Sequence, residues 1–389
     1  MKSRVLLLIA TILMSFSVWA EDAIKIGMST ALTGPVAALG SNMRLGINSY
    51  FELVNKNGGV AGRKLELIAL DDSYEPERAA VNMRDLIDHH GVLAVIGNVG
   101  TPTAIVSVPI AKEKKTLLFG AFSGGEVLRS EPANRYVINY RPSYAEETSE
   151  IIQGLLSNGI KPTEIAFFTQ RDGYGGAGYQ GAINALHLAG FQNTDELAHG
   201  RYTRNTLNVE NAVAVILDAP ITPKAVIMAG GYAPSAKFIK LLRAEIPNML
   251  FINLSFVGSY SLKEALGDEA DNVIVVQAVP ALESNLSIIQ DYSNALKQYD
   301  PELVLNSVSL EGFIVAKIFH QGLLHINGDI TKESIIDGLE SLHRHDIGLG
   351  SDITYDEAEH QAVHRVWLTY FQNGKTKAFT WSMLEQKGN

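Results

Sequence analysis

The sequence alternates short apolar runs with amphipathic segments, and it does so in two successive series. The first series contains apolar runs at residues 23–29, 65–72, 92–98 and 116–122, with helix-like spacing of apolar residues between them. Strands that alternate with helices form parallel sheets covered by helices on both faces. The pattern therefore predicts an α/β fold, with helices beginning near Ser41, spanning Ala79 to His89 and beginning near Thr101.

The pattern then restarts in the second half of the chain. A helix is predicted at Tyr144–Asn158 and another at Tyr179–Ala189, among apolar strand-like runs at residues 164–170, 225–231, 249–255 and 272–278. At about 100 to 200 residues per domain, a chain of 389 residues accommodates two such units. The sequence predicts two doubly wound lobes.

The first twenty residues have the organisation of an export signal. Lys2 and Arg4 precede an uncharged apolar run, Val5–Val18, and Ala20 supplies a small residue at the cleavage position, so Glu21 is expected to begin the mature chain. The run is shorter than the roughly 20 apolar residues of a membrane span. We expect a periplasmic protein released from the membrane by cleavage.

Net charge and cysteine content limit the classes of partner that we expect for this protein. The formal net charge is −10, and it becomes −12 when the two basic residues of the export signal are removed. Nucleic acids and anionic membranes bind proteins with a basic surface, so neither is an expected partner. The chain has no cysteine, which removes the usual site for a lipid anchor after an export signal.

Four polar positions follow predicted strands, at the edge where a doubly wound lobe binds ligands. Thr101 begins a helix, where backbone N–H groups and a hydroxyl can hold an anion. Ser123 follows the fourth strand, and Tyr174 and Tyr232 follow strands of the second series. Structural roles explain the same residues equally well: Thr101 can cap a helix, Ser123 can lie in a turn, and the two tyrosines can pack between the lobes. The residues alone leave both interpretations open.

Several longer motifs carry a resemblance to a known family. They are TALTGPVAALG at residues 30–40, NKNGGVAGRKLELIALDDSYEPERA at 55–79, GNVGTPTA at 97–104, FFTQRDGYGGAG at 167–178 and AGGYAPSA at 229–236. Together they resemble the type I periplasmic binding proteins of the branched-chain amino-acid (leucine/isoleucine/valine-binding) ABC transporter group. The resemblance covers nearly the whole mature chain.

The resemblance implies two Rossmann-like lobes, joined by three crossover segments, that close like a hinge on a small solute. It places lobe 1 in residues 21–140 and 278–364 and lobe 2 in residues 141–277 and 365–389. It implies a monomer that passes a carboxylate-bearing solute, an amino acid or analogue, to an inner-membrane ABC permease; a membrane sensor is the alternative partner. The ligand-binding positions that it implies are Thr101, Phe122, Ser123, Gly124, Tyr174, Tyr232 and Ser255.

Departures from the family pattern bear on the ligand. Leucine-binding relatives have a glutamate that pairs with the substrate ammonium where this chain has Ser255. Without that carboxylate an ammonium loses its strongest partner. Either another acid, such as Asp172 or Glu283, replaces it, or the ligand lacks an amine. Relatives also carry an aromatic residue in place of Leu39 and a hydroxyl in place of Gly124.

An exported NAD-dependent enzyme is the alternative from a different class. Residues 173–178 (GYGGAG) match the dinucleotide fingerprint, but three residues separate them from the preceding strand, whereas a pyrophosphate site needs a glycine at the strand end. His343 and His345 lie too far apart around a helix to chelate a metal. The chain has no G-x-S-x-G motif and no thiol. We therefore expect a binding protein without cofactor, metal or catalysis.

Overall fold

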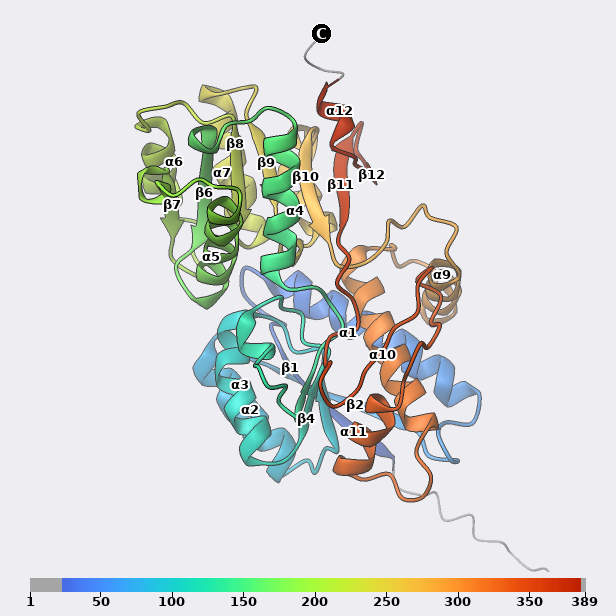
Figure 1. Cartoon of the computed structure of the whole chain (residues 1–389). Coiled ribbons are helices and arrows are strands. Elements are labelled where there is room, and N and C mark those ends of the chain that lie inside the picture. Colours follow the sequence, from blue (N-terminus) through green and yellow to red (C-terminus); the bar gives the residue numbers. More distant parts are fainter. Residues whose placement is uncertain (1–22, 386–389) are drawn as a thin grey trace, which may run out of the picture.

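The chain folds into two α/β lobes, each built around one sheet (Figure 1). The structure is a computed structural model that describes residues 23–385, and the predicted export signal lies outside this range. Three segments of chain pass between the lobes: one after β5, one after β10 and one after α11. The predicted fold class, two doubly wound lobes with three crossovers, is confirmed.

The first lobe contains a five-stranded sheet in which every pair of neighbours is parallel. Its strand order is β2 (Leu65–Asp71), β1 (Ile24–Thr30), β3 (Ala94–Ile96), β4 (Leu117–Phe119) and β5 (Val137–Ile138). The helices of this lobe are α1 (Ala37–Lys56), α2 (Pro76–Asp88), α3 (Thr101–Glu113), α9 (Ser287–Tyr299), α10 (Ser307–Leu324) and α11 (Lys332–Glu340). In Figure 1, α2 and α3 lie on one side of this sheet, and α1 and α10 lie on the other.

The strands of this sheet are apolar on both faces because both faces are covered by helices. Successive side chains of a strand point to opposite faces. Accordingly, Leu117 and Phe119 pack in the core formed with α1 and α10, whereas Leu118 between them packs in the core formed with α2 and α3.

The second lobe contains a seven-stranded sheet. Its order is β12 (Lys375–Ala378), β11 (Trp367–Gln372), β10 (Val273–Gln277), β9 (Leu250–Asn253), β8 (Ala225–Ala229), β6 (Ile165–Gln170) and β7 (His199–Tyr202). The last five of these strands are parallel, and β11 and β12 form an antiparallel hairpin on the edge beside β10. The helices are α4 (Tyr144–Ser157), α5 (Gly173–Leu188), α6 (Glu210–Leu217), α7 (Tyr232–Glu245), α8 (Ser259–Leu266) and α12 (Ser382–Glu385).

Three helices begin earlier than their sequence patterns predict. Helix α1 begins at Ala37 rather than near Ser41, because Gly40 lets the first turn pack on β1: a Cβ there would lie 2.0 Å from the Ala31 carbonyl oxygen. Helix α2 begins at Pro76 rather than Ala79, since proline suits the first helical position. Helix α5 begins at Gly173 rather than Tyr179.

The crossover segments are hydrogen-bonded to one another. The segment after β5 pairs with the segment before β11: the Asn139 N–H donates to the His360 carbonyl at 2.7 Å, and the Ala362 N–H donates to the Asn139 carbonyl at 3.1 Å. The Tyr140 hydroxyl donates to the carbonyl of Ala278, in the segment after β10, at 3.0 Å. The lobes are therefore joined by three crossover segments that are hydrogen-bonded to one another, rather than by three independent linkers.

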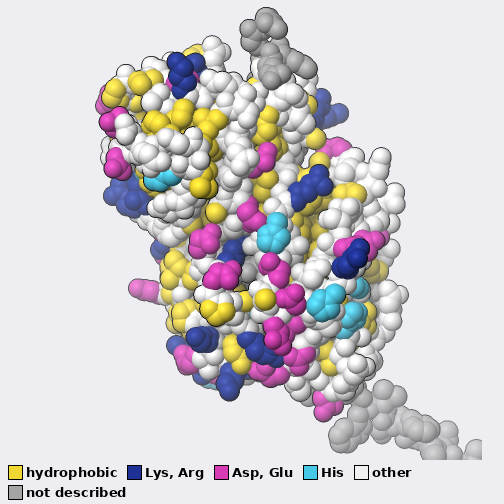
Figure 2. Space-filling view, viewed as in Figure 1, with side chains coloured by type: hydrophobic (Ala, Val, Ile, Leu, Met, Phe, Trp, Pro, Cys, Tyr) yellow, Lys and Arg dark blue, Asp and Glu magenta, His cyan; other side chains and the backbone are white. Residues whose placement is uncertain are grey.

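The face of the molecule that carries this junction is acidic. Figure 2 shows Asp and Glu side chains gathered on the first lobe and up to its border with the second. Beside the junction, the His364 ring lies 2.7 Å from a Glu146 oxygen and 3.6 Å from a Glu359 oxygen. Within residues 23–385, no helix combines the length and apolar character needed to cross a bilayer.

Candidate ligand-binding cleft

The candidate site lies where loops from the two lobes meet. Loops that follow β2, β3 and β4 in the first lobe face the ends of β6 and β9 and the loops after them in the second. The Phe122 and Phe256 rings lie 5.6 Å apart between centroids, and the Gln170 amide donates to the Tyr74 hydroxyl at 3.2 Å. This is the carboxyl edge of both sheets, where doubly wound lobes bind ligands.

The first lobe contributes two buried hydroxyls. Thr101 at the start of α3 and Ser123 after β4 are 3% and 0% exposed, and their hydroxyl oxygens are 2.7 Å apart. The Ser123 oxygen also accepts from the Gly125 N–H at 3.1 Å. Gly100 precedes Thr101 with φ +108°, and a Cβ there would lie 2.2 Å from the Tyr74 ring, so only glycine permits this packing.

Aromatic rings from both lobes surround these hydroxyls. Phe256 is at the centre: its ring centroid lies 4.6 Å from that of Tyr174 and 5.7 Å from that of Tyr74. The Tyr144 and Tyr174 rings lie 5.1 Å apart. These rings and Phe122 are at most 1% exposed. They form an apolar wall between the lobes, with hydroxyl groups at its edge.

Helix α5 brings Tyr174 into this wall. The sequence predicts that the helix begins at Tyr179, but it begins at Gly173, since the Asp172 carboxylate caps it by accepting from the N–H groups of Tyr174 at 3.0 Å and Gly175 at 3.4 Å. A Cβ on Gly175 would lie 1.8 Å from the Gln170 carbonyl. The glycines thus allow close packing of helix on strand.

A second group of residues forms a buried arginine cluster, composed of Arg141, Glu147, Ser255 and Glu311. Arg141 Nε lies 3.2 Å from Glu311 Oε1, and its Nη2 donates to Ser255 Oγ at 2.7 Å. Ser255 in turn donates its hydroxyl to Glu147 Oε1 at 2.6 Å and its N–H to Oε2 at 2.9 Å. The guanidinium lies 4.3 Å from the centroid of the Phe122 ring, so the cluster adjoins the aromatic wall.

Two carboxylates share one guanidinium in this cluster, and their pKa values reflect it. Burial raises the pKa of Glu311 to about 7 and raises that of Glu147, although Arg141 acts in the opposite direction on both. Burial also opposes the charge on Arg141, but Glu311 and Glu147 outweigh it and raise the pKa of that guanidinium. Arg141 therefore stays charged, while Glu311 titrates near neutral pH.

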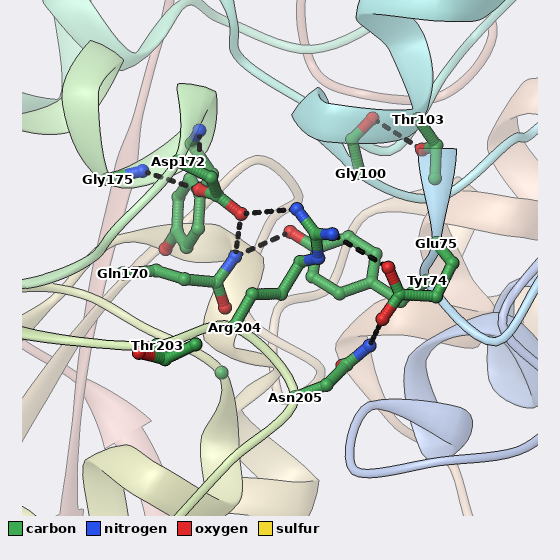
Figure 3. A network of polar contacts seen from close by, with 12 residues as sticks. Tyr74, Glu75, Gly100, Thr103, Gln170, Asp172, Gly175, Thr203, Arg204 and Asn205 are labelled. Atoms are coloured by element: carbon green, nitrogen blue, oxygen red, sulfur yellow. Dashed lines mark hydrogen bonds and ion pairs between the residues drawn. The ribbon is translucent and has the colours of Figure 1, made fainter. Parts of the chain in front are cut away.

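A third group connects the lobes beside Tyr74, and we call it the interlobe polar cluster (Figure 3). Its centre is Arg204, in the second lobe, which lies 2.7 Å from Glu75 of the first lobe and 3.5 Å from Asp172. The Asn205 amide donates to Glu75 at 2.6 Å and to the Ser73 carbonyl at 3.2 Å. These contacts hold the loop after β2 against the second lobe.

The structure brings together most of the sequence-predicted site residues. Thr101, Phe122, Ser123 and Tyr174 lie in the wall just described, and Ser255 joins it through Arg141. Gly124 has a packing role in this structure, since its carbonyl accepts from the Tyr144 N–H at 2.8 Å and a Cβ would lie 2.7 Å from that residue.

Tyr232 lies apart from the aromatic wall. It is the first residue of α7, is half-buried, and has its hydroxyl beside the backbone of Ala38 in the other lobe. Leu39, where relatives carry an aromatic residue, is fully buried, and a Cβ on Gly258 would lie 2.5 Å from it. Both residues therefore contribute to contact between the lobes.

The two acids proposed as partners for a ligand amine are placed differently. Asp172 is occupied as the cap of α5 and by the side chains of Gln170 at 2.6 Å and Arg204 at 3.5 Å. Glu283 is exposed and borders a separate pocket with Tyr260 and Asn306.

Sequence reasoning missed six residues of the cleft. They are Tyr74, Arg141, Tyr144, Glu147, Phe256 and Glu311, all at most 2% exposed. A signal existed for one of them, because Glu311 is the sole acid in the otherwise apolar stretch VSLEGFIVA at residues 308–316. A charged residue in a buried helix is rarely found without a partner.

Two α/β lobes with polar and aromatic residues between the carboxyl edges of their sheets are the architecture of solute-binding proteins. The chain belongs to the periplasmic binding protein family, whose family model matches residues 23–376.

Similar proteins agree with this family. A solved structure described as a possible leucine/isoleucine/valine-binding protein from Rhodopirellula baltica superimposes with a TM-score of 0.91, at 45% identity, over 94% of this chain and 98% of that one. A leucine-binding protein from Thermotoga maritima, 18% identical over 92% of this chain and 98% of its own, has a TM-score of 0.79, which shows the shared fold.

A curated relative, Leu/Ile/Val-binding protein homolog 3 of Brucella melitensis, is 27% identical over 224 residues. The match covers 57% of this chain and spans 58% of the relative's length.

Proposed function

We propose that this protein captures a small carboxylate-bearing solute, an amino acid or an analogue of similar size, between its two lobes in the periplasm and delivers it to an inner-membrane ABC permease. The proposal rests on buried hydroxyls from both lobes: those of Thr101 and Ser123 lie 2.7 Å apart in the first lobe, and Tyr174 of the second lobe adds a buried hydroxyl to the neighbouring cluster of aromatic rings. Hydroxyls around a helix N-terminus suit a carboxylate.

The same geometry accounts for capture. Each lobe carries only part of the wall, so a solute in an open cleft touches one set of groups. A solute that touches both sets favours the closed arrangement, because only that arrangement makes all of the contacts. The bonded crossovers at Asn139, Tyr140 and Ala362 then act as the hinge.

Delivery to a permease follows from the same change of shape. Closure alters the outer surface of both lobes together, and a membrane protein that recognises the closed surface would receive only loaded protein. Relatives named as Leu/Ile/Val-binding proteins support a solute of amino-acid size.

A thermal-shift screen of the mature protein tests the proposal. The library contains amino acids, amides, short organic acids and aromatic acids, because a ligand that binds the folded state alone raises its melting temperature. We expect carboxylates to raise it and matched amides or alcohols not to. A Thr101→Val variant should lose most of the shift. If amides or amines stabilise the protein and carboxylates do not, the proposal is wrong.

A further inference from the structure

We propose that the solute is a monocarboxylic acid with an apolar body and no ammonium group, and that Arg141 and Tyr174 bind its carboxylate. This inference rests on the proposed function and specifies its substrate class. It depends on which buried polar groups of the cleft already have partners and which do not.

Several buried groups of the cleft that lack a hydrogen-bond partner in the part of the chain that the structure describes are donors, and Glu311 Oε1 is an acceptor that lacks one. Within residues 23–385, Arg141 Nη1 and the Tyr174 hydroxyl have no hydrogen-bond partner, although the side chains are 1% and 0% exposed. The Tyr144 hydroxyl, beside Thr101, has none of good geometry either. A buried donor without a partner is costly, and a ligand acceptor removes that cost. Three buried donors without partners match the two oxygens of a carboxylate.

The acidic groups each lie against a protein donor or cation, although Glu311 has an ion-pair contact and no hydrogen bond to Oε1 within the described residues. Both Glu147 oxygens accept from Ser255, and Glu311 is the ion-pair partner of Arg141. Asp172 caps α5 and contacts Arg204. An ammonium in the cleft would have to compete with a protein cation for one of these carboxylates.

One neutral acceptor lies close in sequence to this cluster. Asn253 is fully buried two residues before Ser255, and its amide has no partner within the described residues. An amide oxygen can accept from a hydroxyl but does not balance the charge of an ammonium.

The apolar body of the proposed solute lies against aromatic rings of the protein. Phe122, Phe256 and Tyr74 present apolar faces from both lobes, with ring centroids 5.6 and 5.7 Å apart. Desolvation of a branched or aromatic hydrocarbon group against such faces is favourable, whereas desolvation of an ammonium is not. We therefore expect acids such as 4-methylpentanoate or 3-phenylpropanoate, and their 2-oxo analogues.

Calorimetric titration with matched solutes tests the inference on the mature wild-type chain. One set is leucine, 4-methyl-2-oxopentanoate and 4-methylpentanoate, and the other is phenylalanine, phenylpyruvate and 3-phenylpropanoate. We expect an amine-free acid to bind roughly 100-fold or more tightly than its amino acid, which is the order expected for leaving a charged group without a partner.

The outcomes separate the two proposals. If an amino acid binds as tightly as its amine-free analogue or more tightly, the inference is wrong and the proposed function stands. If 3-methylbutylamine binds and none of the six acids does, the proposed function is wrong and the inference falls with it.

Variants test which groups hold the carboxylate. Tyr174→Phe removes only the unpaired hydroxyl and should weaken binding of the acid about 10-fold or more, in line with the loss of one hydrogen bond to a charged group. Tyr179→Phe, on the same helix with its ring stacked on His199, is the matched control and should bind like wild type. Equal affinity of the Tyr174→Phe and Tyr179→Phe variants would contradict the assignment. Arg141→Lys, which keeps the charge, should bind more weakly than wild type but should retain the preference for the amine-free acid; a reversed preference would contradict the inference.

Discussion

Two arginines in this molecule each lie between two carboxylates, yet their surroundings differ. Arg141, between Glu147 and Glu311, has a side chain that is 1% exposed, whereas that of Arg204, between Glu75 and Asp172, is 23% exposed. Burial makes every unpaired charge expensive, and exposure lets water replace a lost partner. We infer that the buried arginine cluster determines binding chemistry and stability, while the interlobe polar cluster adjusts how readily the lobes stay together.

The largest expected effect is that of Arg141→Gln. Removing this guanidinium takes away the cation that acts most strongly on the buried Glu147 and Glu311, and breaking a buried pair costs about 3–5 kcal/mol. The free energy of unfolding from urea titration measures the loss. Arg84→Gln, which breaks an exposed pair with Glu113, is the control and should change stability by less than about 0.5 kcal/mol. If Arg141→Gln and Arg84→Gln lowered the free energy of unfolding equally, the inference that the buried ion pair matters more than the exposed one would be wrong.

The second effect concerns pH. The pKa of Glu311 is raised from 4.5 to about 7, so the unfolded chain loses this proton before the folded chain does. The contribution of Glu311 to stability therefore falls as pH rises from about 4.5 to about 7, by up to about 3 kcal/mol, and is constant above that. Glu311→Gln removes this dependence. The free energy of unfolding of the variant, relative to wild type, should rise across this pH range, and parallel profiles would contradict the assignment.

Ser255→Ala should have the third largest effect. It removes a hydroxyl that donates to Glu147 and accepts from Arg141, and an unsatisfied buried polar group costs about 1–3 kcal/mol. Ser157→Ala, at the exposed end of α4, is the control for loss of a serine hydroxyl. If the two substitutions lower the melting temperature equally, the Ser255 hydroxyl does not contribute to the stability of the buried arginine cluster.

Arg204→Ala should have the smallest effect. A partly exposed ion pair contributes about 0.2–1 kcal/mol, so affinity for the solute should fall by no more than about fivefold, with little change in the free energy of unfolding. High salt should reduce the difference from wild type, because salt screens exposed charges. A loss of affinity as large as that of Tyr174→Phe would show that this cluster also contacts the solute.

The fold could be predicted well because its main determinant is local. Apolar runs at 94–96, 117–119 and 165–170 are buried on both faces of a sheet, and that requirement is visible in the residues themselves. Helix starts were less predictable. In α5 the glycines at 173–178 indicate a loop in isolation, and they are helical because strand β6 packs closely against them.

The candidate site was also only partly predictable from the sequence. Thr101 and Ser123 could be predicted because strand order places their loops at one edge of a sheet. The buried arginine cluster could not, since Arg141 follows β5, Glu147 lies in α4 and Glu311 lies in α10, and no periodicity relates them. Only the folded chain shows that Ser255 joins a network in which the acids already have partners.

Small-angle X-ray scattering on the mature protein, with and without a saturating concentration of the acid that binds best, tests the central claim that two lobes close on a solute. We expect a smaller radius of gyration with the acid, and no such change for the Tyr174→Phe variant at the same concentration. Superimposable profiles for wild type with and without every binding acid, or chemical conversion of the acid by the protein, would contradict it.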